Sequence, residues 1–445
     1  MTLERYVPGR DGPFSFDEAA HLARRAGFGL AADELESLAR GGLDAAVARL
    51  FGGEGGDEGD EARSLAAQSA VVTERNELPA LQALWLARMA ATRAPASEKL
   101  ALFWHGHFAT SFEKVGSAGW MWGQYRLFRE RGAGPFRELL LEVSRDPAML
   151  VWLDGNSNER GRPNENYARE ILELFSLGVG NYGEKDVQEA ARAFSGWHLK
   201  EGRFWFNARA HDGGEKEIFG KRGAHDGGDV VELCVEHPAC PRFLAAKLLR
   251  FYVAPEPPPE WIEEFAQTLV DEQQVVGASL RRLFASKLFF STRARGGLIA
   301  SPVDFCVGAL RRLRARASWQ AVAAATADMG QALFAPPSVK GWDGDRAWIN
   351  SRTLLERARF AAAAAYGEKP LAASVGWGSL VSGRDRDDPQ RLVAELGRRL
   401  LERRASADTA QRLVRFATSG DAGTGEARIR RVAHLLLTAP EAQLS

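Results

Sequence analysis

The stretch NENYAREILELFSLG, residues Asn164–Gly178, carries the clearest helix signal in this 445-residue chain. Asn164 is a good N-cap because its side-chain oxygen can accept from a free amide of the first turn, and Gly178 is a good C-cap because glycine readily adopts left-handed backbone. Four apolar residues between them follow the i, i+3, i+4, i+7 spacing of a buried face: Ala168, Ile171, Leu172 and Phe175. The stretch predicts a helix packed against a core.

The opposite face of this predicted helix is polar, and it has two interpretations. Asn166, Arg169, Glu170 and Glu173 share one spacing, with Glu165 on the flank at i, i+4 from Arg169. A solvated face with ion pairs of about 0.2–0.5 kcal/mol each is the simpler interpretation. The alternative is a wall of carboxylates in a cleft, where Glu170 and Glu173 could bridge a metal ion.

Helix signals continue in both directions along the chain. Upstream, helices are expected at 64–94, at 97–108 with Ser97 as cap, and over 120–147; downstream, 184–196 follows the same pattern and further helices run from 260 to 437. Residues 198–229 differ, because RFWFN at 203–207 has strand character and many glycines follow. We expect a mainly α, bundle-like protein with one long irregular loop region over about 198–229 and little or no sheet. Its helical regions, 1–255 and 256–445, would pack into one unit.

Composition and charge exclude several classes of protein. The 58 basic and 58 acidic residues balance, which argues against a nucleic-acid binder. Only 10 of the basic residues are lysines, and the arginines of the C-terminal helices alternate with acids such as Glu402, which indicates solvated faces.

No apolar run is long enough for a transmembrane helix, and no secretory signal is visible. The three cysteines are too few for a disulfide framework, so a cytoplasmic location is expected. The acidic, glycine-rich segment 52–60 is expected to be a flexible surface loop.

Two histidines in FWHGHF, residues 103–108, suggest metal ligation. Residues at i and i+2 of an α-helix lie about 200° apart, so His105 and His107 could share an ion only if Gly106 ended the helix. The periodicity also places His107 on the apolar face with Trp104, which is typical of a hydrogen-bonded core histidine. Both interpretations stay open.

The string HDGGEK, residues 211–216, offers an imidazole and a carboxylate on glycine-rich backbone, with Lys216 within reach. His211 and Asp212 are normal ligands for zinc or non-haem iron and equally normal turn residues. A second HDGG string at 225–228 has the same two interpretations and lacks the lysine.

The whole chain resembles the bacterial family catalogued as domain of unknown function 1800. The matching strings include HLARRAGFG at 21–29, FWHGHFATS at 103–111, MLVWLDGN at 149–156, PNENYARE at 163–170, DVQEAARAFSGW at 186–197 and LLLTAPEAQ at 435–443. Lys247 and the pair Gly341-Trp342 also fit. The resemblance implies an α-helical fold and no established activity. It further implies a frequent neighbour, the domain of unknown function 1501 family, which looks like the phosphatase and sulfatase group. Many relatives look exported, which the missing signal segment puts in doubt here.

Two hypotheses of function follow from these strings. In the first, a metal-dependent hydrolytic or oxidative enzyme holds a divalent transition metal, zinc or iron, on His105, His107, His211 and Asp212. The catalytic groups would be Glu165, Glu170, Arg169 and Lys216, with a glutamate as general base and a cation stabilising negative charge. In the second, the chain is a non-catalytic helical scaffold or partner protein whose polar motifs form buried hydrogen-bond networks.

Overall fold

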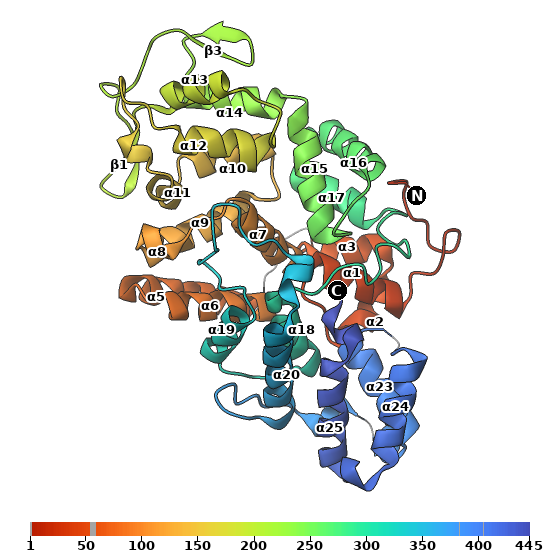
Figure 1. Ribbon diagram of the computed structural model, residues 1–445. Coiled ribbons are helices and arrows are strands. Elements are labelled where there is room, and N and C mark those ends of the chain that lie inside the picture. The colour runs from red at the N-terminus through yellow and green to blue at the C-terminus, as the bar shows by residue number, and fades with distance from the viewer. Residues whose placement is uncertain (1, 54–58, 382, 404) are drawn as a thin grey trace.

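The computed structural model describes residues 2–53, 59–381, 383–403 and 405–445, and helices make up most of them (Figure 1). The mainly α prediction is therefore confirmed. The first helices are α1 (Phe16–Ala26), α2 (Ala32–Gly41), α3 (Leu43–Leu50), α4 (Asp60–Ala67), α5 (Ser69–Arg75), α6 (Leu78–Ala91), α7 (Pro95–His107), α8 (Phe112–Val115), α9 (Ala118–Arg131), α10 (Phe136–Ser144) and α11 (Pro147–Trp152).

The middle of the chain contains the strands. It runs through η1 (Gly155–Ser157), α12 (Glu165–Glu170), the π-helical turn η2 (Ile171–Ser176), α13 (Glu184–Phe194), β1 (Trp197–Lys200), β2 (Arg203–Phe206), β3 (Lys216–Ile218), β4 (Lys221–Gly223), α14 (Gly227–Glu236), α15 (Ala239–Tyr252), α16 (Pro259–Asp271) and α17 (Val276–Phe284). Each strand pair is an antiparallel hairpin, with Trp197 opposite Phe206 in the first and Lys216 opposite Gly223 in the second. Both hairpins fall in the segment predicted to be irregular, and the strand expected at 203–207 is β2.

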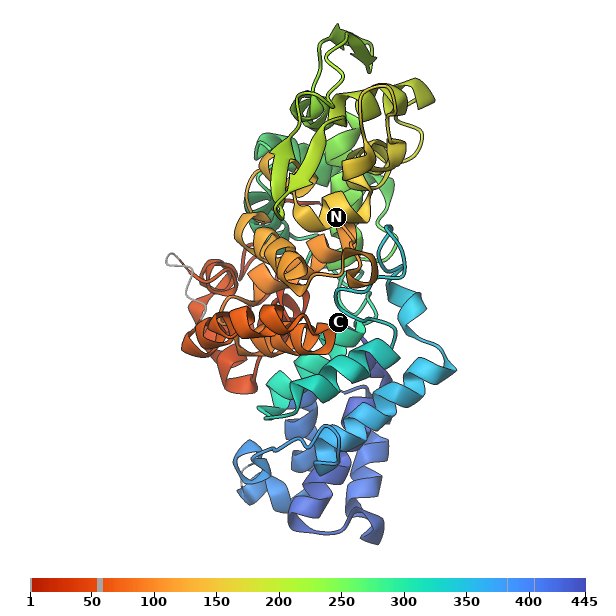
Figure 2. The ribbon, with the colours of Figure 1, turned by 90° about the vertical axis from the view of Figure 1, so that its left-hand side faces the viewer.

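The remaining elements are helical. They are α18 (Pro302–Leu313), α19 (Trp319–Asp328), η3 (Asp345–Trp348), α20 (Ser351–Tyr366), α21 (Trp377–Leu380), α22 (Gly383–Asp387), α23 (Pro389–Leu401), α24 (Ala407–Thr418), η4 (Gly420–Ala422), α25 (Gly425–Thr438) and η5 (Pro440–Gln443). The two views show an elongated molecule with the hairpins at one end and α23–α25 at the other (Figure 2). None of the described helices combines the length and the apolar character needed to cross a membrane.

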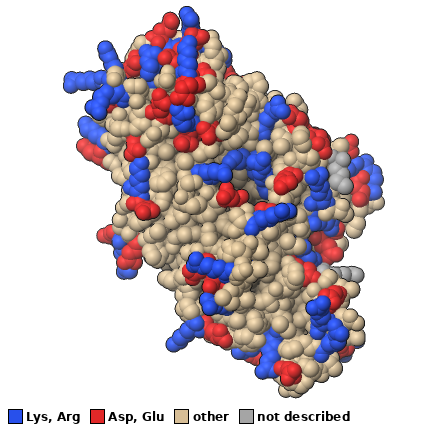
Figure 3. Space-filling model, in the orientation of Figure 1, with Lys and Arg blue, Asp and Glu red and all other residues tan. Residues whose placement is uncertain are grey.

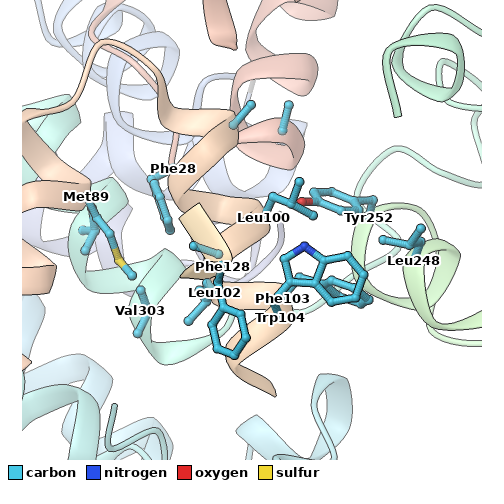
Figure 4. Close-up of a cluster of buried hydrophobic side chains, with 14 of the residues drawn as sticks. Phe28, Met89, Leu100, Leu102, Phe103, Trp104, Phe128, Leu248, Tyr252 and Val303 are labelled. Carbon is cyan, nitrogen blue, oxygen red and sulfur yellow. The ribbon is translucent and has the colours of Figure 1, made fainter. Parts of the chain in front are cut away.

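The central helix is α7, which is buried on almost every side. Figure 4 shows Leu100, Phe103 and Trp104 of α7 in a cluster with residues from several other helices, among them Leu248 and Tyr252 of α15. A helix that is buried on all sides usually has an apolar sequence all round. The buried polar side chains of α7 each have a partner. It is therefore the element against which distant parts of the chain are positioned.

Two helix predictions differ from the structure. The helix expected over 64–94 is three helices, because Asn76 adopts a left-handed conformation and bonds through its side chain to Gly116 and Ala118, and Pro79 then starts α6. The helix expected to begin at a Ser97 cap begins at Pro95, since proline is favoured in the first turn. The predicted flexible loop at 52–60 lies mostly outside the described residues.

The interleaved charges of the C-terminal helices are not all solvated, and Glu402 corrects that prediction. Glu402 ends α23, and its side chain is fully buried. One carboxylate oxygen accepts from the Leu30 amide at 2.7 Å, and the other lies 3.5 Å from Arg24 of α1 and 3.4 Å from Arg312 of α18. This ion cluster joins the first helix to the C-terminal helices. It crosses the boundary expected near residue 255, and the division into regions 1–255 and 256–445 stays a prediction.

Candidate functional site

The FWHGHF string forms the last turn of α7, and each of its polar atoms faces a different neighbour. The helix continues through Gly106 to His107, so the two imidazoles stay on different sides, as helix geometry predicts. His105 lies against Trp85, Phe334 and Trp342, whereas the ring of His107 lies against Phe103, Phe108, Phe175 and Phe243. The two histidines therefore do not share an ion.

His105 holds the segment that follows α19. Its Nε2 accepts a hydrogen bond from the backbone amide of Phe334 at 2.9 Å, and because that amide can only donate, the ring proton must be on Nδ1. Burial lowers the pKa of His105 to about 3, so the ring is neutral. His105 is a positioning residue in the core.

His107 has the opposite tautomer. Its Nε2 donates to the carbonyl oxygen of Phe175 in η2 at 3.0 Å, which leaves a lone pair on Nδ1. Burial, with Lys247 as a second cause, lowers the pKa of His107 to about 3. Among the described residues Nδ1 is buried and has no hydrogen-bond partner. Unlike His105, His107 lines a cavity.

Gly106 fits against the loop that connects α19 to η3. Gly341 in this loop has a φ of +81°, and a Cβ on it would lie 2.2 Å from the carbonyl oxygen of Gly106. Only glycine allows so close an approach of two backbones. The contact brings Lys340 and Trp342 to the end of α7.

A cavity of about 480 Å³ opens where these elements meet. Its wall comes from α1, α7, α15, the start of α18 and the loop 331–348, which are far apart in the sequence. The volume is typical of pockets that hold small molecules. Four aromatic residues take part in the wall: Phe103, Phe251, Trp342 and Trp348.

Positive charge exceeds negative charge round this cavity. Figure 3 shows Lys and Arg side chains gathered at a hollow near the middle of the displayed face. The five cationic residues of the wall are Arg25, Lys99, Lys247, Arg250 and Lys340, and the three acidic residues are Asp304, Asp343 and Asp345. The chain as a whole has zero formal net charge, so this excess is local.

Two of the cations are neutralised and three are not. Lys99 is buried and pairs with Asp304, and Lys340 pairs with Asp343 at 3.1 Å. Among the described residues, the other three cations have no ion pair with a carboxylate: Arg25, Lys247 and Arg250. Such groups attract an anion from solution.

Arg25 is buried in the wall of the cavity. Its side chain is 1% exposed, and its terminal nitrogens donate to the carbonyl oxygens of Tyr252 and Ala294. Its Nε is buried with no partner among the described residues, as is Nδ1 of His107. Both residues line the 480 Å³ cavity, so a small molecule bound there could approach these two polar atoms.

The predicted residues of α12 lie elsewhere, on a surface network. Arg169 donates to Glu165 at 2.9 Å and to Glu184 of α13 at 2.7 Å, and these side chains are partly exposed. Burial raises the pKa of Glu170, and the negative charge of Glu173 acts in the same direction. The positive charge of Arg169 acts in the opposite direction. The polar face of α12 thus carries the ion pairs of the first interpretation at Arg169, while Glu170 is partly buried.

His211, Asp212 and Lys216 stabilise the turn before β3. His211 Nδ1 bonds to the Ser195 carbonyl oxygen at 2.9 Å, and Arg192 donates to Asp212 at 2.8 Å and holds the pKa of that carboxyl down to about 2. Lys216 is buried and donates to the carbonyl oxygens of Asp212 and Gly214 at 2.6 and 3.0 Å.

The later His225–Gly228 string has a structural role, in which Asp226 is the N-cap of α14.

The shared pocket expected for these groups is not found in the described structure. Of the eight predicted site residues, only His107 lines the 480 Å³ cavity. Among residues 2–53, 59–381, 383–403 and 405–445, no three His, Cys, Asp or Glu side chains are grouped so that they could hold a metal ion. The ligand set of His105, His107, His211 and Asp212 stays a prediction that these contacts do not support, because each of the four side chains bonds to its own neighbour.

Sequence reasoning missed the cavity lysines, although one signal was available. Only 10 of the 58 basic residues are lysines, yet Lys99, Lys247 and Lys340 all line one cavity.

Comparison with known proteins gives a family but no activity. The sequence model of the family described as "Protein of unknown function (DUF1800)" matches residues 21–444. No curated protein and no solved structure matches.

Proposed function

Because the chain belongs to the family Protein of unknown function (DUF1800), which comes with no activity, we propose from the site alone that it binds an organic anion with a flat ring. The cavity at the end of α7 is the binding site. One observation carries this proposal: unpaired cations from α1 and α15 meet aromatic side chains from α7, α15 and the 331–348 loop in a single cavity.

The chemistry of the wall defines the class of ligand. Arg250 supplies an exposed guanidinium group, which suits the paired oxygens of a phosphate or a carboxylate, and the buried Arg25 adds positive charge to the wall. Phe103, Trp342 and Trp348 supply ring faces and edges against which a flat ring can pack. An aromatic phosphate satisfies both halves of the site.

The test uses pyridoxine 5′-phosphate and adenosine monophosphate as probes, with titration calorimetry as the measurement. We expect saturable binding of at least one probe, weaker binding of pyridoxine without its phosphate, and a loss of affinity with added salt. Arg250→Gln should weaken binding about tenfold, which corresponds to ~1.4 kcal/mol for one lost charged contact.

Arg242→Gln is the matched control, because Arg242 lies on the same helix and pairs with Glu263 outside the cavity. Its affinity for the probe should equal that of the unaltered protein. Failure of both probes to bind, or equal loss in the two variants, would contradict the proposal.

The other expectations from the sequence are kept as proposals. A metal-dependent reaction lacks a ligand set in the described part of the chain, and we rank it below ligand binding. If calorimetry detects no binding of either probe, the hypothesis of a non-catalytic scaffold is favoured. A cytoplasmic location fits the three free, buried cysteines. Association with a phosphatase-like protein of the domain of unknown function 1501 family rests on the resemblance alone.

A further inference from the structure

We propose that Lys247 is a nucleophilic amine that forms an imine with a carbonyl group of the bound anion. This inference rests on the proposed function, because the cavity must first hold the anion. It goes further in assigning a reactive atom, the Nζ of Lys247, and a reactive class of ligand, an anionic aldehyde or ketone.

The position of Lys247 distinguishes it from the other two lysines of the cavity. It lies on α15 and is half-buried, with its Nζ 5.4 Å from the centre of the Phe243 ring. Lys99 and Lys340 are each held by a carboxylate, whereas Lys247 has no such partner in the described residues. An ammonium group held by an aspartate is poorly reactive, so Lys247 is the lysine that is free to react.

The surroundings of Lys247 favour its neutral form. Partial burial is the first cause that lowers its pKa, and the charges of Arg250, one turn along α15, and Lys340, from the facing loop, act in the same direction. The third facing group is His107 of α7, which is neutral. An amine that loses its proton more easily is a better nucleophile near neutral pH.

The reaction needs no oxidant, reductant or metal. The lone pair of Nζ attacks the carbonyl carbon and forms a C–N bond. The carbonyl oxygen takes one proton from Nζ and one from solvent and leaves as water, so that a C=N bond with one proton on Nζ remains and one new positive charge lies among the cations of the wall. The negative group of the ligand offsets that charge, which is why an anionic carbonyl compound fits better than a neutral one.

The experiment treats the full-length protein with pyridoxal 5′-phosphate, which differs from pyridoxine 5′-phosphate in having an aldehyde. Borohydride then reduces any imine to a stable secondary amine, and mass spectrometry of peptides locates it. We expect the modified fraction of Lys247 to exceed that of each exposed lysine at least about fivefold at neutral pH. Excess pyridoxine 5′-phosphate should protect Lys247 alone.

A pair of variants supplies the control. Lys247→Arg should remove the protected label and its imine absorbance. Lys185→Arg, on the surface at α13 and paired with Glu217, should leave both unchanged. The melting temperature of each variant shows whether it is folded.

The outcomes separate the two proposals. If pyridoxine 5′-phosphate binds but Lys247 is labelled no faster than exposed lysines, the imine inference is overturned and the proposed function stands. If the phosphate probes do not bind and labelling follows exposure alone, both proposals are overturned.

Discussion

At the scale of single residues, two histidines separated by one glycine have opposite tautomers. His105 accepts at Nε2 from an amide and His107 donates at Nε2 to a carbonyl, so a different backbone atom orients each ring, and burial keeps both rings neutral. A buried neutral histidine makes folding depend on pH, because the unfolded chain can take up a proton that the folded chain excludes.

The direction follows from the lowered pKa of His105. The free energy of unfolding should be fully maintained above the ordinary histidine pKa of 6.5 and should fall as the pH drops toward the folded value of about 3. Between pH 7 and 5 we expect His105 to account for a loss of about 2 kcal/mol. His105→Gln keeps an acceptor for the Phe334 amide. Between pH 7 and 5 its free energy of unfolding, measured by urea titration, should fall by about 2 kcal/mol less than that of the unaltered protein. His225→Gln, at the surface hairpin, should follow the unaltered protein; equal slopes in all three would contradict the assignment.

Residue patterns within one helix could be interpreted from the sequence, and contacts between distant residues could not. The apolar stripe of Asn164–Gly178 and the 200° separation of His105 and His107 both hold in the structure. The site did not follow from these patterns, since Lys247 and Trp342 meet only through tertiary packing. The proposed metal ligands were each plausible alone, but nothing in their spacing required them to approach one another.

At the scale of elements, the end of α7 determines where the 331–348 loop lies. The loop is fixed by the bond from the Phe334 amide to His105 and by the contact of Gly341 with Gly106. Within the Trp-His-Gly-His string, His105 and Gly106 hold this loop, and His107 lines the cavity. Residues 52–60 show the reverse case, where the prediction falls mostly on residues that the structure does not describe.

Gly341→Ala tests this arrangement. The added Cβ would lie 2.2 Å from the carbonyl oxygen of Gly106, so the loop must move. Gly161→Ala is the control, because Gly161 also has a positive φ, +79°, but its Cβ would meet nothing within 4 Å and it lies outside the cavity. Both variants should lose about 1 kcal/mol of stability from backbone strain. Only Gly341→Ala should lose more than that, together with most of the affinity for pyridoxine 5′-phosphate; equal effects would show that the close contact is not needed.

At the scale of the whole molecule, a buried ion cluster connects the two ends of the chain. Glu402 lies between Arg24 of α1 and Arg312 of α18, with no exposed surface. From the sequence this glutamate looked like one member of a solvated row, because its partners Arg24 and Arg312 are 378 and 90 residues away along the chain. Long-range partners of this kind cannot be found from local charge patterns.

Glu402→Gln should destabilise the protein by about 3–5 kcal/mol, since it leaves buried arginines without their counter-charge. Glu426→Gln removes an exposed carboxylate that pairs with Arg430 on the same helix, and it should cost less than about 0.5 kcal/mol. Chemical unfolding of both variants gives the comparison. A small effect at Glu402 would mean that the cluster contributes little to holding the termini together.

The contact of α7 with the 331–348 loop has a consequence for the nascent chain during translation. During translation α7 leaves the ribosome long before the residues that complete the cavity have been synthesised. A nascent chain up to α15 therefore has Lys99, His107 and Lys247 but no opposite wall. The cavity is therefore complete only when most of the polypeptide has been made.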